Sequence, residues 1–240
     1  MNSIFLPDVS SPPGLLSEQH LDMVTMPHTH PETILINSLS RVFGIRPSDD
    51  NTAPENLLLS DLARLFRVRK IDAEAVMEKH DRPWANVYLI QHGVVRMFRE
   101  TASGKVAIHH FFSEGDIIWP VFGRSRTVRN TLCLNSSMPV TAWVADFAAF
   151  RSEVQSHGEG QWPKFALALT EELAELASMR EYRKHTMPAS ERYALMQDEY
   201  PELTKRVPDN QLAAWLGVVP ATFSRLKSAA SGRTGTHTKL

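Results

Sequence analysis

The sequence contains a single cysteine, Cys133, among its 240 residues. One thiol cannot form an internal disulfide, and it excludes the clustered thiolates of an iron–sulfur centre or a structural zinc site. No run of about eighteen apolar residues occurs, so we expect no membrane-spanning helix. Residues 1–14 have no basic segment followed by an apolar run, so we expect no signal peptide. These absences predict a cytoplasmic protein without a membrane partner.

Motifs of catalysis are lacking as well. The chain has no Gly-rich phosphate loop, no evident pair of catalytic carboxylates and no activated serine. An acid–base or metal cluster can be imagined from His92, His109, His110 and Asp116, but their spacing matches no known metal or nucleophile motif. We therefore expect no catalytic residue, no metal site and no cofactor, and we expect that the protein is not an enzyme.

The composition, 42% hydrophobic and 22% charged, is that of an ordinary globular protein, and 240 residues favour one or two domains. The net charge of −1 indicates no particular partner, but its distribution is uneven. From Leu203 to Leu240 six Lys and Arg side chains stand against one acid, Asp209. Such an excess is typical of a nucleic-acid-binding segment. A solvated basic end without a partner is the alternative.

The N-terminal quarter, residues 1–56, is rich in Pro, Ser, Asp and Asn, and we interpret it as an extension with one helix near Ile34–Phe43. A second helical pattern begins at Pro54, and it places Leu58, Leu62 and Leu65 on one face. We expect this helix to pack on the domain that follows.

Between Val68 and Val144 the pattern changes to short runs of period two, separated by turn residues. The clearest predicted strands are Val87–Ile90, Val94–Arg99 and Val106–Phe112. Several short strands at this spacing indicate an antiparallel sandwich or barrel.

A strongly helical segment runs from Trp162 to Arg183 and carries one apolar stripe that needs a partner. The partner is either the β domain of the same chain or the same helix of a second subunit. The spacing fits a short two-helix seam that ends at Arg180. Its inward positions would be Ala166, Leu169, Leu173 and Leu176.

Two helix pairs follow. Ser190 is the expected N-cap of the first helix, and Pro201 ends it. In the second pair we expect Asp209 as N-cap, Gly217 in the left-handed conformation and Pro220 in the first turn of the last helix. Ala213 allows a close crossing, and the inward apolar positions are Leu212, Leu216, Val218, Phe223 and Leu226. This pattern predicts a helix-turn-helix from Asp209 to Lys227.

Polar residues on the outer face of the last helix favour DNA binding over a hairpin of core helices. A guanidinium can bond a guanine edge at two places, so Arg225 is the main candidate for base recognition. Hydroxyls and amines nearby would contact bases or phosphates. The predicted DNA-contacting residues are Lys205, Arg206, Asn210, Ala221, Thr222, Ser224, Arg225 and Lys227.

In their order along the chain, several short segments resemble the Crp/Fnr transcription regulators, the family of the cyclic-AMP receptor and the fumarate–nitrate regulator. The resemblance covers about Leu62 to Lys227. It rests on Leu65-Phe66-Arg67-Val68-Arg69-Lys70, Val87-Tyr88-Leu89-Ile90, Gly93-Val94-Val95-Arg96, His110-Phe111-Phe112, Gly115-Asp116, Glu191-Arg192-Tyr193, Tyr200-Pro201-Glu202-Leu203, Arg206-Val207-Pro208, Leu216-Gly217 and Phe223-Ser224-Arg225.

The resemblance implies an α+β protein with a cyclic-nucleotide-binding-like antiparallel β-roll, a long dimerisation helix and a C-terminal helical helix-turn-helix domain. It implies a homodimer that recognises a roughly palindromic duplex DNA site and, if it activates, contacts RNA polymerase. The expected segments are the extension 1–56, the β-roll 57–157, the dimerisation helix 158–186, the DNA-binding domain 187–230 and a flexible tail 231–240.

The chain departs from the family where an effector would bind. Gly115-Asp116 stands for the family's Gly-Glu pair, Arg124-Ser125 or Arg126-Thr127 is a shortened match to its phosphate-binding pair, and Trp119-Pro120 intrudes. We therefore expect an effector other than a cyclic nucleotide. The candidate pocket residues are Gly115, Asp116, Trp119, Arg124, Ser125, Arg126 and Thr127.

The recognition helix departs too, because Val219 and Ala221 replace the family's usual Thr and Glu on either side of the proline. Losing a capping hydroxyl costs about 1 kcal/mol, and losing a carboxylate removes an acceptor for cytosine. The alternative function is therefore a sensor with impaired DNA binding that works through protein contacts. No wing strands are expected after Lys227.

Overall fold

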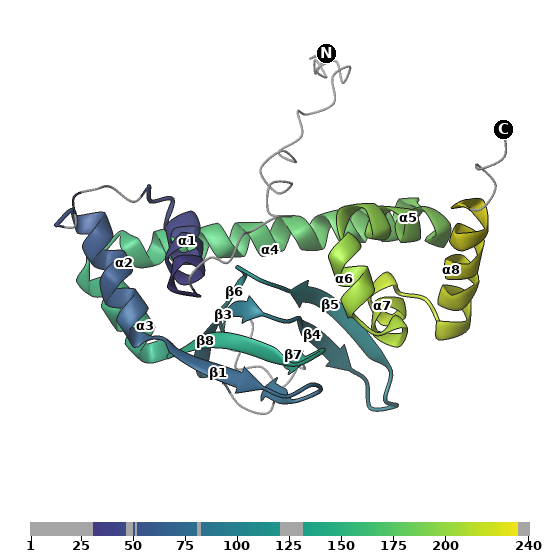
Figure 1. The fold of residues 1–240 in the computed structure, drawn as a ribbon, viewed down its shortest axis with the longest axis horizontal. Coiled ribbons are helices and arrows are strands. Elements are labelled where there is room, and N and C mark those ends of the chain that lie inside the picture. The colour runs from purple at the N-terminus through teal and green to yellow at the C-terminus, as the bar shows by residue number, and fades with distance from the viewer. Residues whose placement is uncertain (1–30, 47–49, 51, 81–82, 121–131, 235–240) are drawn as a thin grey trace, which may run out of the picture. The chain divides into compact units, whose positions relative to one another are not determined.

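The computed structural model describes residues 31–234 except 47–49, 51, 81–82 and 121–131, and these residues fold as one unit (Figure 1). Helices flank a β-roll at both ends of the chain. The helices are α1 (Pro31–Phe43), α2 (Pro54–Leu65), α3 (Phe147–Ser156), α4 (Gln161–Thr186), α5 (Ala189–Glu199), α6 (Pro201–Arg206), α7 (Asp209–Leu216) and α8 (Pro220–Thr234). The strands are β1 (Arg67–Ile71), β2 (Val76–Glu78), β3 (Asn86–His92), β4 (Val95–Glu100), β5 (Val106–Phe112), β6 (Ile117–Ile118), β7 (Leu132–Ser136) and β8 (Val140–Asp146).

The strands form two antiparallel four-stranded sheets, ordered β1-β8-β3-β6 and β2-β7-β4-β5. The three clearest strands of the sequence pattern are β3, β4 and β5, so the predicted antiparallel sandwich is confirmed. Both sheets contribute to one apolar interior, which includes Ile90, Val95, Leu134 and Ala142. Among the described residues, no helix is long and apolar enough to cross a bilayer.

Gly93 sets the tight connection between β3 and β4. Its φ is +110°, a conformation that residues with a Cβ rarely adopt. A Cβ at this position would lie 2.6 Å from the Pro139 carbonyl oxygen and 2.9 Å from the Val140 Cα. Glycine is therefore required both by the backbone angle and by the neighbouring chain.

Part of the segment expected as an N-terminal extension packs into the same core as the β-roll. Leu35, Leu39 and Phe43 of α1 are buried in one apolar cluster with α2, α3 and the start of α4. The ring of Phe43 lies 5.3 Å from that of Phe165 on α4. The helices predicted near Ile34 and at Pro54 both form, and α2 crosses the expected boundary between residues 56 and 57.

The long helix predicted at Trp162–Arg183 is α4, with 26 residues. Its apolar stripe packs against its own chain. Leu169 is 5% exposed and belongs to the same apolar cluster as Phe43, and Ala166 packs against that cluster. Leu173 packs against the β-roll interior. Leu176 lines a small cavity of the same chain. Of the two partners considered for the stripe, the intrachain one is observed.

Three expectations about the C-terminal helices were wrong. The N-cap of α5 is Pro188 rather than Ser190, and the N-cap of α7 is Pro208, so Asp209 lies in the first turn. Each proline already has the φ of −58° and the extended ψ that an N-cap needs. Residues 231–234, expected in a flexible tail, continue α8, where the Ser228 and Ser231 hydroxyls donate to carbonyls four residues earlier.

Candidate nucleic-acid interface

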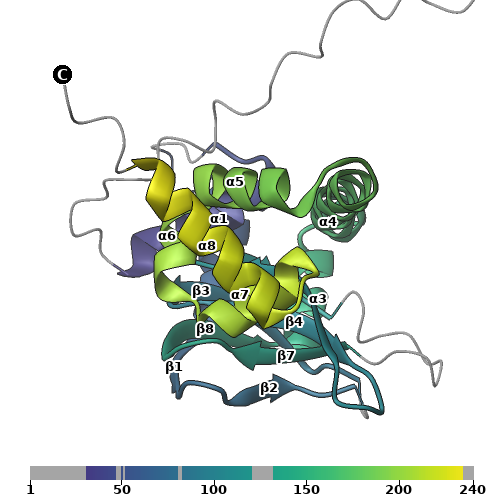
Figure 2. The same cartoon turned by 90° about the vertical axis from the view of Figure 1, so that its right-hand side faces the viewer.

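Helices α7 and α8 form the helix-turn-helix at one end of the described chain, where Figure 2 views them directly. Gly217 ends α7 with φ +76° and ψ 30°, and Pro220 begins α8, both as predicted. The Val218 N–H donates to the Ala213 carbonyl at 3.0 Å and so closes the turn. Leu212, Ala213 and Phe223 are buried at the crossing, which leaves the opposite side of α8 to solvent.

The predicted DNA-contacting side chains lie largely on that solvent side. Ser224, Arg225 and Lys227 are exposed on α8, as is Ala221, whereas Thr222 is half-buried. Asn210 is exposed at the start of α7, next to the buried Gln211. The structure thus brings the base-recognition candidates together on one helix.

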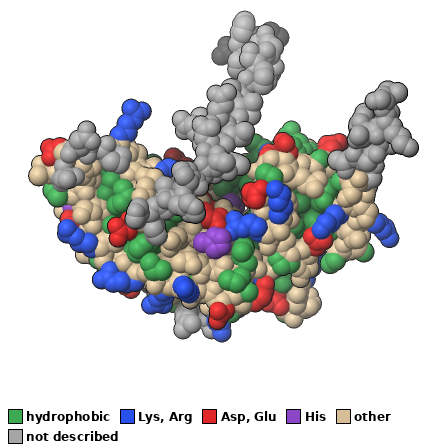
Figure 3. Space-filling model, viewed as in Figure 1, with side chains coloured by type: hydrophobic (Ala, Val, Ile, Leu, Met, Phe, Trp, Pro, Cys, Tyr) green, Lys and Arg blue, Asp and Glu red, His purple; other side chains and the backbone are tan. Residues whose placement is uncertain are grey.

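Three predicted phosphate-binding cations are already paired with carboxylates. Lys205 contacts Glu202 at 2.7 Å, and Lys227 contacts Asp209 at 2.8 Å. Arg206 contacts Glu114 at 2.6 Å. On the face drawn in Figure 3, Lys and Arg side chains are accordingly interspersed with Asp and Glu. Arg225, in contrast, forms no ion pair with any residue in the described part of the chain.

The Arg206–Glu114 pair crosses from α6 to the loop after β5. Two guanidinium nitrogens donate to the two carboxylate oxygens, at 2.9 and 2.6 Å. The Gly93 N–H donates to the same carboxylate at 2.8 Å. Burial alone would raise the pKa of Glu114, but the hydrogen bonds from Arg206 and Gly93 hold that pKa below its usual value. Glu114 is therefore ionised at neutral pH.

Apolar contacts reinforce this junction. Phe111 of β5 and Trp215 of α7 meet edge to face, with ring centroids 5.3 Å apart. Val94, Phe98 and Ile108 of the β-roll share a buried cluster with Leu212 and other residues of α5–α8. The Gln211 amide donates to Glu74 at 2.8 Å. The first helix of the helix-turn-helix is thus packed against the β-roll.

The candidate effector residues fall into two groups. Gly115 and Asp116 form the turn before β6, in which the Ser113 N–H donates to the Asp116 carboxylate at 2.7 Å. Trp119 is 5% exposed, and its ring packs among Phe147, Trp162 and Phe165. Trp119 is therefore a core residue. Arg124, Ser125, Arg126 and Thr127 lie outside the described residues.

A cavity of about 20 Å³ lies between α1, β5, β6 and α4, and it is lined by Arg41, His110, Asp116 and Glu172 among others. One ordered water needs about 10–15 Å³, so this space is large enough for one water and too small for a nucleotide. Arg41 reaches Glu172 at 3.4 Å across it. Helix α1 therefore occupies the side from which a larger ligand would approach α4.

Two groups in this cavity have shifted pKa values. Burial raises the pKa of Asp116 to about 6. Burial lowers the pKa of His110 to about 4, with a further contribution from the positive charge of Arg180. At neutral pH Asp116 is thus ionised and His110 is neutral.

The four groups considered for an enzymatic cluster do not form one. His110 and Asp116 share the small cavity, but His92 lies beside Glu114 at 3.4 Å. His109 lies at a bulge of β5 and has a pKa lowered to about 4 by burial and by the charges of Arg99, Arg180 and Lys184.

Sequence patterns missed Glu114 and Glu74, the acids that bind Arg206 of α6 and Gln211 of α7. Both lie in loops or turns of the β-roll, far along the chain from Arg206 and Gln211. Glu74 adopts a φ of +59° in its turn, which marks it as unusual, but this angle is visible only in the structure.

No protein-family model and no curated protein matches the chain. Solved structures do match: FixK2 from Bradyrhizobium japonicum has a TM-score of 0.60 at 16% identity, covering 70% of this chain and 86% of FixK2. CLP from Xanthomonas campestris, a c-di-GMP responsive global regulator, has a TM-score of 0.57 at 12% identity, covering 76% and 95%.

A third match is a transcriptional regulator of the Crp/Fnr family from Eubacterium rectale, with a TM-score of 0.58 at 12% identity and coverage of 77% and 85%. All three matches extend over most of both chains. At these identities the likeness establishes the fold. The chain has the fold of the Crp/Fnr transcription regulators.

Proposed function

We propose that the protein is a homodimeric transcription regulator that binds a roughly palindromic duplex DNA site through α8 and is controlled through its β-roll. The observation that carries the proposal is the α7–Gly217–α8 geometry, with buried apolar residues at the crossing and exposed polar residues on α8. A core hairpin would not leave Ser224, Arg225 and Lys227 in solvent.

In this proposal α8 enters the major groove. Arg225, unpaired within the described residues, bonds guanine O6 and N7, and Thr222 and Ser224 bond bases or phosphates. Lys205, Arg206 and Lys227 neutralise phosphates after exchanging their present carboxylate partners for DNA. Val219 and Ala221 then alter the sequence preference relative to the family rather than abolish binding.

Dimerisation is proposed through α4, using the face turned away from its own chain. Large apolar side chains on this helix remain exposed: Leu167 at 58%, Met179 at 45% and Tyr182 at 57%. Leu169 is buried within the protomer, so it cannot contact a second subunit. Of the seam residues expected from the sequence, only the partly exposed ones can contribute to the dimer interface. A two-fold dimer places two α8 helices about 34 Å apart, in successive major grooves.

Control through the β-roll is proposed to act on the junction at Glu114. Arg206 cannot serve Glu114 and a DNA phosphate at once, so an undocked α6–α8 binds DNA more tightly. An activator of this class would then also contact RNA polymerase. The effector would be a small molecule other than a cyclic nucleotide, because Gly115-Asp116 replaces the Gly-Glu pair of the nucleotide-binding family members.

A sensor that acts through protein contacts is the second candidate. It is favoured by Val219, which exposes 64% of its surface at the turn of the helix-turn-helix. An exposed aliphatic residue there suits a protein partner better than a phosphate backbone.

The deciding experiment is selection of bound sequences from random duplex DNA by the purified protein, beside Arg225→Ala, at two salt concentrations. We expect a two-fold-symmetric motif that becomes degenerate in the variant. Salt-labile binding without a motif, or no binding, would favour the protein-contact candidate.

The proposed dimer is checked separately by sedimentation of a Leu167→Glu, Tyr182→Glu double variant. We expect a folded monomer with the circular dichroism spectrum of the wild type and a lower melting temperature, because association no longer stabilises the folded state. A double variant that remains dimeric would move the interface away from this face of α4.

A further inference from the structure

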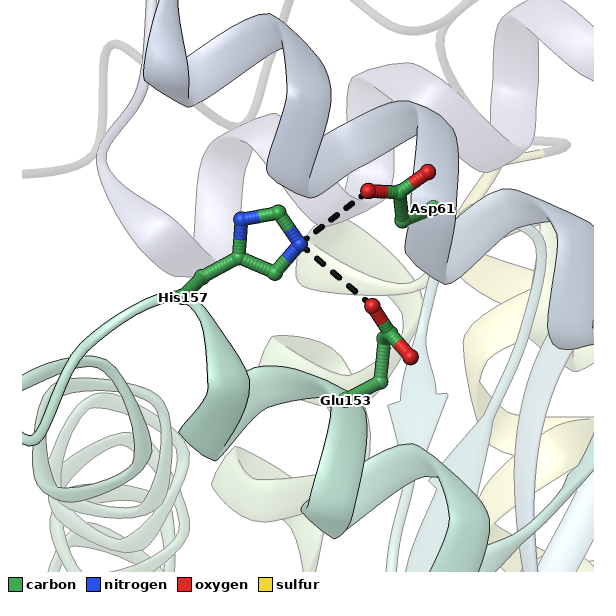
Figure 4. A group of neighbouring side chains, drawn as sticks. All are labelled: Asp61, Glu153 and His157. Atoms are coloured by element: carbon green, nitrogen blue, oxygen red, sulfur yellow. Dashed lines mark ion pairs between the residues drawn. The ribbon is translucent and has the colours of Figure 1, made fainter.

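Three side chains from two helices converge on one point on the outside of the β-roll domain (Figure 4). Asp61 lies on α2, Glu153 lies on α3, and His157 follows the end of α3. Each is partly buried, with side-chain exposures of 31%, 33% and 19%. Among the described residues this is the one group of three His, Cys, Asp or Glu side chains whose ligand atoms lie within 4.8 Å of one another.

The two distances from His157 to the carboxylates are those of a chelate. Glu153 and His157 are four residues apart, which places them on one side of the same helical turn. The His157 Nε2 atom lies 3.2 Å from an Asp61 oxygen and 3.4 Å from a Glu153 oxygen, while the other ring nitrogen points away from both (Figure 4). Ligand atoms bound to one tetrahedral Zn²⁺ at about 2.0–2.2 Å lie about 3.3–3.6 Å apart.

The remaining contacts leave these atoms available. Arg64 donates to the other oxygen of Asp61, and its own side chain is 75% exposed, so it can turn into solvent. The Ser156 hydroxyl donates mainly to the Glu153 carbonyl, at 2.7 Å, and lies 3.5 Å from the carboxylate. Two carboxylates facing one imidazole nitrogen form a donor set of the kind that binds divalent transition metals.

We propose that Asp61, Glu153 and His157 bind one divalent transition-metal ion of the Zn²⁺ type, with a fourth position open to water. Sequence patterns predicted no metal site because Asp61 is remote in the chain from the other two ligands. The ion would tie α2 to α3 just before the turn at Gly158 that leads into α4. The site is independent of DNA binding.

The test is a Zn²⁺ titration of the full chain, freed of metal by a chelator, in competition with a chromophoric chelator. The variants are Asp61→Asn and Glu153→Gln, which keep shape and lose charge. We expect one tight site in the wild type and at least about 100-fold weaker binding in each variant, because even outer-shell changes at metal sites cost 10–100-fold. Co²⁺ should give tetrahedral absorption bands in the wild type and not in Asp61→Asn or Glu153→Gln.

The matched control is Glu181→Gln. It breaks a second Glu–His pair of the same spacing, Glu181 with His185 on α4. This pair is exposed, and no third His, Cys, Asp or Glu among the described residues completes a ligand set with it. This variant should keep the tight site. The proposal is overturned if wild-type binding is no tighter than micromolar, or if Asp61→Asn and Glu153→Gln bind Zn²⁺ like the wild type.

Folding is monitored in the same samples. Zn²⁺ should raise the melting temperature of the wild type and of Glu181→Gln, but not that of Asp61→Asn. With chelator present, all four proteins should melt alike, since partly exposed ion pairs contribute little to stability. A melting-temperature rise in Asp61→Asn equal to that of the wild type would place the metal elsewhere.

Discussion

Arg206 of α6 and Glu114 of the β-roll form a two-armed ion pair, with donor–acceptor distances of 2.9 and 2.6 Å. The arginine is one that the sequence predicted for DNA phosphates. The glutamate also accepts a hydrogen bond from the Gly93 N–H, so the connection between β3 and β4 helps to position its carboxylate for Arg206. One residue is thus shared between the intrachain junction and the proposed DNA contact.

Glu114→Gln should increase affinity for DNA. The amide keeps an acceptor for the Gly93 N–H but loses the charge that holds Arg206, which weakens the docked state by about 1–2 kcal/mol. If docking competes with DNA, the apparent Kd falls by up to about 30-fold. Fluorescence anisotropy with the selected site measures it. Glu202→Gln, which breaks an exposed pair within α6, is the control. An unchanged or higher Kd for Glu114→Gln would separate docking from DNA binding.

Lys227→Gln should weaken binding equally on all DNA sequences. Its amine, now held by Asp209, is expected to neutralise a phosphate, which carries no sequence information. The slope of log K against log salt should decrease in magnitude by about 1. Lys164→Gln, on α4, should leave the slope as it is. If Lys227→Gln also leaves it unchanged, Lys227 lies outside the interface.

Asp116→Asn should stabilise the protein at neutral pH but not in acid. Burial raises the pKa of Asp116 from 3.8 to about 6, so the folded chain holds this proton more tightly than the unfolded chain. Ionisation therefore costs stability as pH rises from about 4 to about 6, and the full cost persists above that range. Since Asp116 is partly exposed, we expect a gain of about 1–2 kcal/mol at pH 7.5 that becomes small near about pH 3.5.

Urea denaturation at several pH values measures this difference. The low pKa values of His109 and His110 reduce stability below pH 6.5 in both proteins, so they largely cancel in the comparison. Asp198→Asn, on α5, controls for loss of a charge. A gain that is constant with pH would show that Asp116 ionises as freely in the folded chain as in the unfolded one.

Gly93→Ala should be far more damaging than Gly158→Ala. Both glycines have positive φ, +110° and +127°. The added Cβ meets backbone atoms of Pro139 and Val140 below 3.0 Å at the first site and nothing within 4 Å at the second. We expect a loss of about 3–5 kcal/mol at Gly93, from backbone strain and overpacking together, and about 1–2 kcal/mol at Gly158. Thermal unfolding distinguishes them, and equal losses would refute the steric argument.

The sequence predicted what depends on local pattern. Alternating residues located β3–β5, and the small, glycine and apolar positions from Ala213 to Leu226 located the helix-turn-helix. Pairing between distant segments was not predictable: Glu114 meets Arg206, and Phe43 meets Phe165, only after the chain has folded. The cap errors have another cause, because side-chain preference pointed to Ser190 and Asp209 while proline geometry set the helix starts at Pro188 and Pro208.

Helix α4 amplifies small rotations of the backbone at its N-terminal end. With 26 residues at 1.5 Å each it is about 39 Å long. A rotation of about 10° at the turn around Gly158, where no atoms crowd the glycine, displaces the far end by about 7 Å over that length. In the proposed dimer the two DNA half-sites are separated by about 34 Å, so a displacement of this size decides whether the two α8 helices match the spacing of the major grooves.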